Sequence, residues 1–157
     1  RTNSARLLVL ADVSASMDPW QSFVEMLPDS LILGRLASAE VYYFSNLPRN
    51  QLFAAHSLKE PVLRDEVLRQ NTGAGVLMIS DAGSARGYLN RRRALQTSKF
   101  LAELAGKCPA IVWLNPMPRA RWAGTTAGLI ASSPAVTMLP LNAPQLMHAI
   151  DILRGNR

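Results

Sequence analysis

The sequence has one cysteine, two histidines and no long apolar run. The single cysteine and the absence of a long apolar run each exclude a class of protein. With Cys108 alone, the chain cannot form an internal disulfide and offers no thiolate set for zinc. No apolar segment approaches the ~20 residues that cross a bilayer as a helix, and no signal peptide is recognisable. We therefore expect a protein without a membrane span. Its cysteine usage is compatible with a reducing compartment, which favours the cytoplasm.

Acidic residues are also few, because 11 Asp and Glu stand against 17 Lys and Arg and give a formal net charge of +6. This balance permits an acidic partner, either a protein or a nucleic acid. The densest basic run, Arg91–Arg93, falls at the start of an expected helix, where charge runs usually form a solvated face. No nucleic-acid recognition motif accompanies it, and aromatic residues nearby are few. We therefore rank nucleic-acid binding below protein binding.

A length of 157 residues is close to the size of a typical single domain. The composition, 48% hydrophobic and 18% charged, is that of an ordinary globular protein. The sequence contains no repeat, no low-complexity tract and no linker, so we expect residues 1–157 to form one domain. Because the chain begins with Arg1 rather than methionine, we expect it to be a segment of a longer protein.

Short apolar runs that suit buried strands alternate with helical patterns along the whole chain. This alternation predicts an α/β fold, namely a doubly wound, mostly parallel sheet with helices on both faces and a short antiparallel edge strand. The expected strands cover residues 7–11, 40–45, 51–54 (the edge strand), 76–79, 110–114 and 135–139, and the expected helices cover 19–33, 62–69, 90–105, 122–131 and 142–154.

The first strand is followed by the sequence D-x-S-x-S, formed by Asp12, Ser14 and Ser16. In an extended loop, residues two apart point the same way, so we expect these three side chains to converge. One carboxylate and two hydroxyls are hard oxygen donors, which suit Mg²⁺ or Mn²⁺. The same residues also fit a purely structural arrangement, a strand end followed by a serine turn and a helix that Asp18 caps.

Asp81 and Asn115 also follow buried strands directly. In open α/β sheets, ligand sites form beyond the carboxyl ends of the strands, so we expect both residues near Asp12. Asp81 would then supply a second carboxylate. It would either bind the metal or accept a hydrogen bond from a metal-bound water.

Together these motifs resemble the von Willebrand factor A (VWA) domain and its metal-ion-dependent adhesion site. The D-x-S-x-S motif of that family is present as residues 12–16, and its distal aspartate matches Asp81 within Ile79–Gly83. The segment Val112–Pro116 resembles the "WLNP" segment of the bacterial CoxE-like branch, and residues 139–141 followed by 149–155 are similar to the end of that branch. The resemblance therefore covers nearly the whole chain.

The resemblance implies a protein-binding module rather than an enzyme. It implies that Mg²⁺ or Mn²⁺ is held by Asp12, Ser14, Ser16 and Asp81, and that a carboxylate from a partner protein fills an open position on the metal. Members of the CoxE-like branch often act beside an AAA+ ATPase of the MoxR type, and related domains occur in bacterial conflict or stress systems. We therefore expect a partner that presents an acidic residue.

One element of the family pattern has no good counterpart here, namely the threonine that precedes a helix between the second strand and the strand that ends at Asp81. Thr72 lies in a glycine-containing stretch, but a strand begins almost at once after it. Ser57 matches no better. We therefore expect the metal to bind weakly or to keep water in the place of this ligand.

The rival interpretation is a Mg²⁺-dependent phosphatase-like or nuclease-like hydrolase in which Asp12 is the nucleophile or a metal ligand. Haloacid-dehalogenase-type phosphatases carry D-x-D after the first strand, but Ser14 stands at the second of these positions. No G-x-S-x-G elbow of a serine hydrolase is present. His56 falls in a loop and His148 in the C-terminal helix, so neither is placed as a general base. We therefore expect no enzymatic activity.

Overall fold

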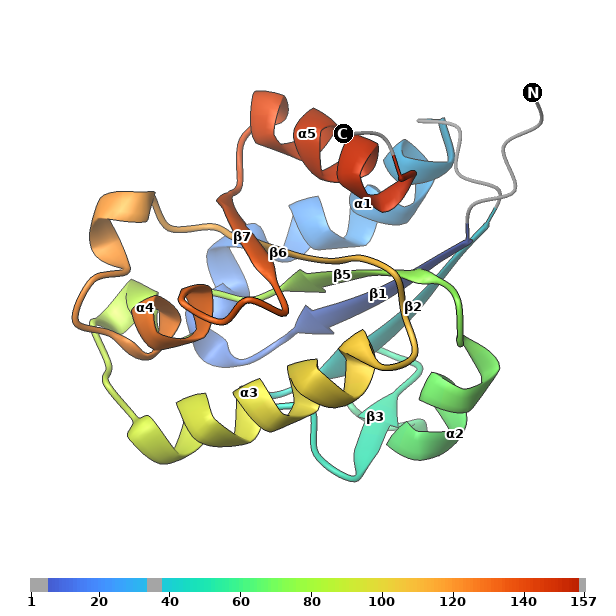
Figure 1. Ribbon diagram of the computed structural model, residues 1–157, viewed down its shortest axis with the longest axis horizontal. Helices are drawn as coiled ribbons and strands as arrows, with labels where there is room; N and C mark the ends of the chain where they lie inside the picture. The colour runs from blue at the N-terminus through green and yellow to red at the C-terminus, as the bar shows by residue number, and fades with distance from the viewer. Residues whose placement is uncertain (1–5, 34–37, 156–157) are drawn as a thin grey trace.

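The computed structural model of the chain has one central sheet with the strand order β4-β3-β2-β1-β5-β6-β7 (Figure 1). The structure describes residues 6–33 and 38–155, without the side chains of residues 28–33. The strands are β1 (Arg6–Asp12), β2 (Ser38–Phe44), β3 (Gln51–Phe53), β4 (Pro61–Leu63), β5 (Gly75–Ile79), β6 (Ile111–Asn115) and β7 (Thr137–Pro140).

Five of these strands, β2, β1, β5, β6 and β7, are parallel, and β3 and β4 extend the sheet as antiparallel neighbours beside β2. The predicted fold class is therefore confirmed. Strand β1 pairs with β2 on one side and with β5 on the other, so the chain reverses its direction of travel across the sheet between β1 and β5. In doubly wound sheets, this reversal opens a crevice at the carboxyl ends of the two strands.

Helices cover both faces of the sheet, as Figure 1 shows. Helices α1 and α5 pack on one face and α2, α3 and α4 on the other. None of the helices within the described ranges is long and apolar enough to cross a membrane. The helices are α1 (Gln21–Leu33), α2 (Arg64–Gln70), α3 (Arg91–Ala105), α4 (Thr126–Ala131) and α5 (Ala143–Leu153), with short 3-10 helices η1 (Ala15–Trp20), η2 (Ser84–Arg86) and η3 (Arg119–Arg121).

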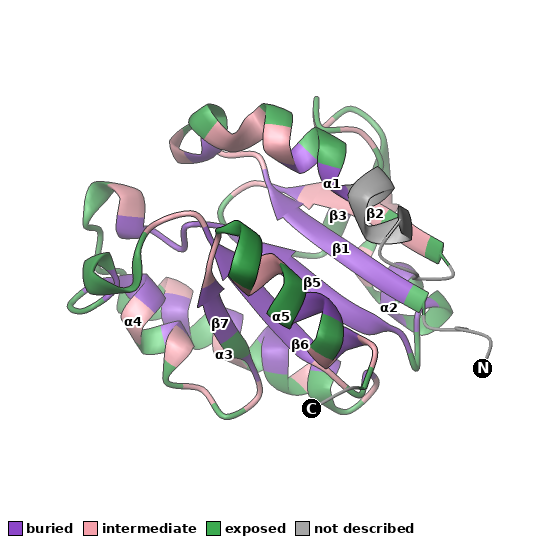
Figure 2. Ribbon diagram, turned by 90° about the horizontal axis from the view of Figure 1, so that it is seen from above, coloured by how far each residue is buried: buried purple, intermediate pink, exposed green. Residues whose placement is uncertain are grey.

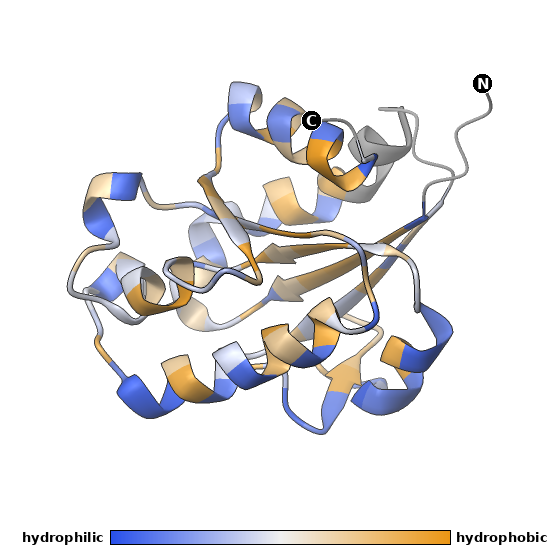
Figure 3. Ribbon diagram, viewed as in Figure 1, coloured by the Kyte–Doolittle hydropathy of each residue, from blue (hydrophilic) through white to orange (hydrophobic). Residues whose placement is uncertain are grey.

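The central strands are buried on both faces (Figure 2). In β1, Leu7 and Val9 point into the core beneath α1 and α5, whereas Leu8 and Leu10 point into the core on the opposite face. The hydropathy colouring shows the same strands as apolar along their length (Figure 3). Continuous apolar runs therefore form these strands because alternate side chains enter two different cores. In β1, β5 and β6, polar residues occur only at the first or last position of a strand.

Residues Val62 and Leu63 differ from their predicted helical state, because they belong to the short strand β4. They pair with Leu52 and Gln51 of β3 in an antiparallel register. The helical pattern is therefore correct only from Arg64 onward. A hairpin partner at the sheet edge supplies backbone hydrogen bonds that the local helical preference of these two residues does not outweigh.

The start of the first helical segment also differs from the prediction. Helical turns begin at Ala15, in η1, so Asp18 lies inside a helix and does not cap one. The cap predicted for the last helix is present, because the side chain of Asn142 accepts a hydrogen bond from the backbone N–H of Gln145 at 3.0 Å. Because η1 begins at Ala15, the loop after Asp12 is shorter than predicted, and Ser16 lies in a helical turn rather than in an extended loop.

Helix α4 packs unusually closely on the loop before it, which leads to a prediction about Gly128. A Cβ atom at this position would lie 2.7 Å from the carbonyl oxygen of Trp122. We expect Gly128→Ala to lower the free energy of unfolding by about 1–3 kcal/mol, because overpacking outweighs the better helix propensity of alanine. Urea denaturation measures this change.

Gly106→Ala is the matched control, because a Cβ at position 106 would meet only ordinary contacts, the nearest at 3.5 Å. We expect this variant to be unchanged in stability or up to about 1 kcal/mol more stable. Equal effects of the two substitutions would contradict the close packing of α4.

Candidate functional site

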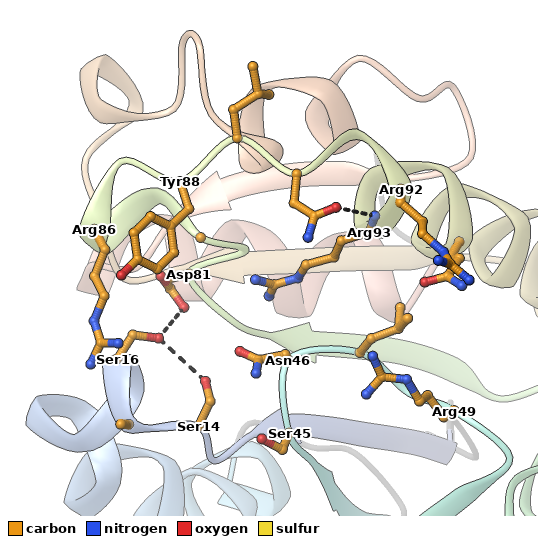
Figure 4. A pocket seen from close by; sticks show the side chains of 16 residues that line it. Ser14, Ser16, Ser45, Asn46, Arg49, Asp81, Arg86, Tyr88, Arg92 and Arg93 are labelled. Atoms are coloured by element: carbon orange, nitrogen blue, oxygen red, sulfur yellow. Dashed lines mark hydrogen bonds between the residues drawn. The ribbon is translucent and has the colours of Figure 1, made fainter.

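An open cavity of about 810 Å³ lies where β1, β2 and β5 end (Figure 4). Its walls come from the loops that follow these three strands and from the start of α3. Because neighbouring parallel strands end at the same edge of a sheet, segments far apart in the sequence meet here. The lining residues are Ser14, Ala15, Ser16, Ser45, Asn46, Leu47, Arg49, Asp81, Gly83, Arg86, Tyr88, Leu89, Asn90, Arg92, Arg93 and Gln96.

Asp12 lies beneath this cavity rather than in its wall, and it is 1% exposed. Its Oδ1 accepts hydrogen bonds from the backbone N–H groups of Ser14 (2.9 Å) and Asn46 (3.1 Å). Its Oδ2 accepts a hydrogen bond of 2.7 Å from the hydroxyl of Ser80. The Asp12 carboxylate therefore ties together the loops that follow β1, β2 and β5.

The other three predicted ligands, Ser14, Ser16 and Asp81, do line the cavity. The Oγ atoms of Ser14 and Ser16 are 3.4 Å apart, and the Ser16 hydroxyl donates to Asp81 Oδ1 at 2.9 Å, as the dashed lines of Figure 4 show. Ser14 has extended backbone angles, whereas Ser16 lies in the first turn of η1. The predicted convergence is therefore present for these residues, but a helical turn produces it rather than an extended loop.

The loop after β5 is held by buried polar side chains that do not line the cavity. Asn115, at the end of β6, donates from Nδ2 to the carbonyl oxygen of Asp81 at 3.1 Å. Trp113 donates from Nε1 to the carbonyl oxygen of Ser80 at 2.8 Å. Asn115 was predicted to lie near the site, and its observed role is to position the backbone that carries Asp81.

Two loop residues at the site adopt left-handed backbone conformations that are unusual for residues other than glycine. Asn46 has φ 66° and Ala82 has φ 51°. Such conformations cost about 1–3 kcal/mol and persist where neighbouring contacts fix them. The N–H of Asn46 is held by Asp12, and the N–H of Ala82 donates to the Ser80 hydroxyl at 3.0 Å. Both strained conformations are therefore held by the hydrogen bonds around the Asp12 carboxylate and the Ser80 hydroxyl, which we call the buried network.

Arg93 brings a positive charge into the site from the first turn of α3. Its Nη2 lies 3.8 Å from Oδ2 of Asp12, and its side chain is 15% exposed. Its Nε is buried without a hydrogen-bond partner among the described residues. Burial lowers the pKa of the Arg93 guanidinium, the carboxylates of Asp12 and Asp81 act in the opposite direction, and Arg49 adds to the lowering.

The basic run 91–93 was predicted to be a solvated face, and this holds for Arg91 and Arg92 but not for Arg93. The inward turn of Arg93 follows from its place beside the buried Ala94 and from the attraction of Asp12. Ser45 and Arg49 line the same cavity and were not predicted, because no motif marks them. They reach the site only because β2 ends beside β1.

The two counterparts considered for the family threonine lie elsewhere. Thr72 precedes β5 at the opposite end of that strand, and its hydroxyl is within hydrogen-bond distance of the carbonyl oxygens of Leu68 (3.3 Å) and Arg69 (3.1 Å). Ser57 is exposed in the turn between β3 and β4 and does not line the cavity. Neither residue therefore contributes to the site.

The oxygen atoms at the cavity floor are of the type that binds a hard cation, but they are few. Ser14, Ser16 and Asp81 offer oxygen atoms at the cavity floor, and oxygen is the ligand that Mg²⁺ and Mn²⁺ prefer. Within residues 6–33 and 38–155, no group of three or more His, Cys, Asp or Glu side chains is placed to hold a metal. The positive charge of Arg93 opposes a second cation nearby.

No known protein-family model matches the sequence, and no curated protein matches it either.

Ser80 was not predicted as a functional residue, and the structure makes its hydroxyl a test of the buried network. Ser80→Ala removes the hydrogen bond to Asp12 and leaves the N–H of Ala82 without its acceptor. We expect the free energy of unfolding to fall by about 2–3 kcal/mol, because a charged and a neutral buried group both lose a partner. Urea denaturation with an unchanged m-value measures the loss.

Ser132→Ala is the control for this substitution, because Ser132 is exposed and bonds only to the carbonyl oxygen of Leu129. We expect its effect to stay within about 0.5 kcal/mol. A Ser80 variant as stable as this control would show that the network does not hold the loops.

Proposed function

We propose that this chain is a metal-dependent protein-binding module of the VWA type. In this proposal Ser14, Ser16 and Asp81 hold Mg²⁺ or Mn²⁺ at the cavity floor, and a carboxylate of a partner protein completes the site. The observation that carries the proposal is the convergence of these three oxygen-bearing side chains at the crevice between β1 and β5. Such a crevice is where doubly wound sheets bind ligands.

Asp12 has a different task from the other three residues in this proposal. Its carboxylate is fully engaged with Ser14, Asn46, Ser80 and Arg93, so it holds the loops and supplies negative charge beneath the metal. Bound Mg²⁺ would supply an exchangeable coordination position, because this ion usually takes one or two protein carboxylates and keeps several waters. Ser14, Ser16 and Asp81 would hold the ion, because all three line the open cavity.

The side chains around the cavity favour binding over catalysis. His56 lies 3.5 Å from Glu25, away from the cavity, and His148 is exposed on α5. The acidic side chain that lines the cavity, Asp81, already accepts hydrogen bonds from Ser16 and from the N–H of Ala85. Neither histidine is therefore placed to act as a general base at this cavity, which favours binding over catalysis in this proposal.

The resemblance to the CoxE-like branch adds a partner to the proposal. We propose that the module works with a MoxR-type AAA+ ATPase or within a multi-protein bacterial conflict or stress system, in the cytoplasm. The positive charge around the cavity suits an acidic partner surface. The single cysteine, Cys108, is a free buried thiol, which is compatible with that compartment.

Metal binding is tested by thermal unfolding of the wild type and of the double variant Ser14→Ala/Ser16→Ala. We expect Mg²⁺ or Mn²⁺ at about tenfold above its Kd to raise the wild-type Tm by about 3–6 °C, because a ligand that binds only the folded state stabilises it. The double variant loses two oxygen donors and should show no shift. Ser57→Ala removes a hydroxyl outside the cavity and should retain the full shift. Equal shifts in all three proteins would refute the site.

Arg93 gives a second test, since its charge competes with a metal ion. We expect Arg93→Gln to fold with lower stability, because Asp12 loses its ion-pair partner. Its metal-induced rise in Tm, measured against the same variant without metal, should nevertheless be larger than in the wild type, because one cation has left the site. Arg91→Gln, with the same charge change on the exposed side of α3, should give the wild-type rise. A smaller rise in Arg93→Gln would contradict this placement of the metal.

A further inference from the structure

Four arginines, Arg49, Arg86, Arg92 and Arg93, line the cavity, against a single lining carboxylate, that of Asp81. Among the residues that the structure describes, the first three form no ion pair or side-chain hydrogen bond, and the guanidinium of Arg93 forms an ion pair with Asp12 alone. Elsewhere in the described ranges, Arg91 and Arg154 also lack a partner, whereas the other arginines are engaged, as in the bond from Arg121 to the carbonyl oxygen of Ala85. Three of the five described arginines without such a partner therefore line this cavity.

The start of α3 makes this concentration costly for the free protein. Arg91, Arg92 and Arg93 occupy its first turn, and no acidic residue accompanies them there. The N-terminus of a helix carries partial positive charge, so cations there are unfavourable and anions are favourable. Arg49 also acts on Arg93, whose pKa burial already lowers. An anion in the cavity would relieve all of these repulsions.

The arginines are spread across the cavity rather than gathered around one point. Figure 4 shows Arg86 beside Ser16 on one side, Arg92 and Arg49 on the other side, and Arg93 between them. A second cavity of about 470 Å³ shares Arg49 with the first and adds the amino group of Lys99. Its one lining carboxylate among the described residues, that of Glu103, already lies 3.7 Å from Arg64 and 3.9 Å from Lys107. One small anion cannot reach both ends. The arrangement suits an extended ligand with several negative groups.

The rim of the cavity favours a peptide over a nucleic acid. Tyr88 and Leu89 are 57% and 48% exposed and offer apolar surface for side chains of a partner. Proteins that bind single-stranded nucleic acids stack successive bases on several aromatic side chains. Tyr88 is the one aromatic residue among the described residues that line the first cavity.

We infer that the two cavities form a docking groove for an extended acidic segment of a partner protein, with carboxylates bound by Arg86, Arg93, Arg92 and Arg49 in turn. Guanidinium groups bind carboxylates through paired hydrogen bonds. The inference rests on the proposed function in one respect, that the partner is an acidic protein. The arginines act on several carboxylates, whereas the metal would take only one.

The experiment measures the binding of a fluorescein-labelled oligoglutamate of about eight residues, which reaches about 27 Å when extended. Fluorescence anisotropy is recorded with Mg²⁺ and, separately, with EDTA. We expect binding by the wild type in both conditions, tighter with Mg²⁺ than with EDTA because the proposed metal and the acidic ligand favour each other. Affinity should fall as salt rises. Arg86→Gln/Arg92→Gln should bind about tenfold or more weakly, because charge-assisted hydrogen bonds are lost at two points of the groove.

Arg91→Gln is the matched control, since this arginine shares the first turn of α3 but lies outside both cavities. It should bind within about twofold of the wild type, because exposed charges away from the contact are screened by salt. All substituted arginines are exposed, so the variants should keep the wild-type Tm. Equal affinities of the double variant and this control would overturn the inference.

Two further ligands define the specificity of the groove. Oligoglutamine of the same length should not bind, and oligothymidylate should bind more weakly than oligoglutamate. Binding of oligoglutamine, or tighter binding of oligothymidylate, would overturn the inference, in the second case in favour of single-stranded nucleic acid.

The same measurements separate this inference from the proposed function. If EDTA and Ser14→Ala/Ser16→Ala leave binding unchanged while the arginine variant weakens it, the docking groove is supported and the metal-dependent function fails. If the serine variant abolishes binding while the arginine variant has no effect, the metal-dependent function is supported and the docking groove fails.

Discussion

The buried carboxylate of Asp12 is the interaction on which the rest of the site depends. Burying a charge is costly unless it is paired and hydrogen-bonded. Here the cost is offset by two backbone N–H groups, the Ser80 hydroxyl and the Arg93 guanidinium. These four partners come from the loops after β1, β2 and β5 and from α3. One charge therefore fixes three loops and the first turn of a helix, and so fixes the walls of the cavity.

This arrangement divides the site into two layers of opposite charge. Asp12 and Asp81 supply negative charge at the floor, and arginines supply positive charge around the walls. A cation at the floor would be attracted by the first layer and repelled by the second, so the proposal implies weak binding of the metal alone. An anion in the groove would remove the repulsion between the arginines and the cation, because it neutralises the arginines. It would also be able to ligate the metal. The proposed metal and the proposed acidic partner are therefore expected to bind cooperatively.

The fold contributes the rigidity that such a site requires. Strands β1 and β5 are buried on both faces, so the positions of Asp12 and Asp81 at their ends are set by two separate cores. Asn115 and Trp113 of β6 then hold the backbone of residues 80 and 81. Left-handed conformations at Asn46 and Ala82 are retained by the same hydrogen bonds. The proposed binding residues are thus carried by loops whose backbone is held by these hydrogen bonds.

The sequence by itself determined the α/β sheet and the placement of Ser14, Ser16 and Asp81 at one edge of it. Both follow from local pattern, because apolar runs define buried strands and parallel strands end together. It did not reveal β4, the burial of Asp12 below the cavity, or the placement of the arginines around that cavity. The pairing of Val62 with Leu52 and the approach of Arg49, Arg86 and Arg93 join segments distant in the chain. Only the tertiary structure decides such contacts. Core packing and the buried charge of Asp12 determine which loops meet and which arginine side chain points into the site.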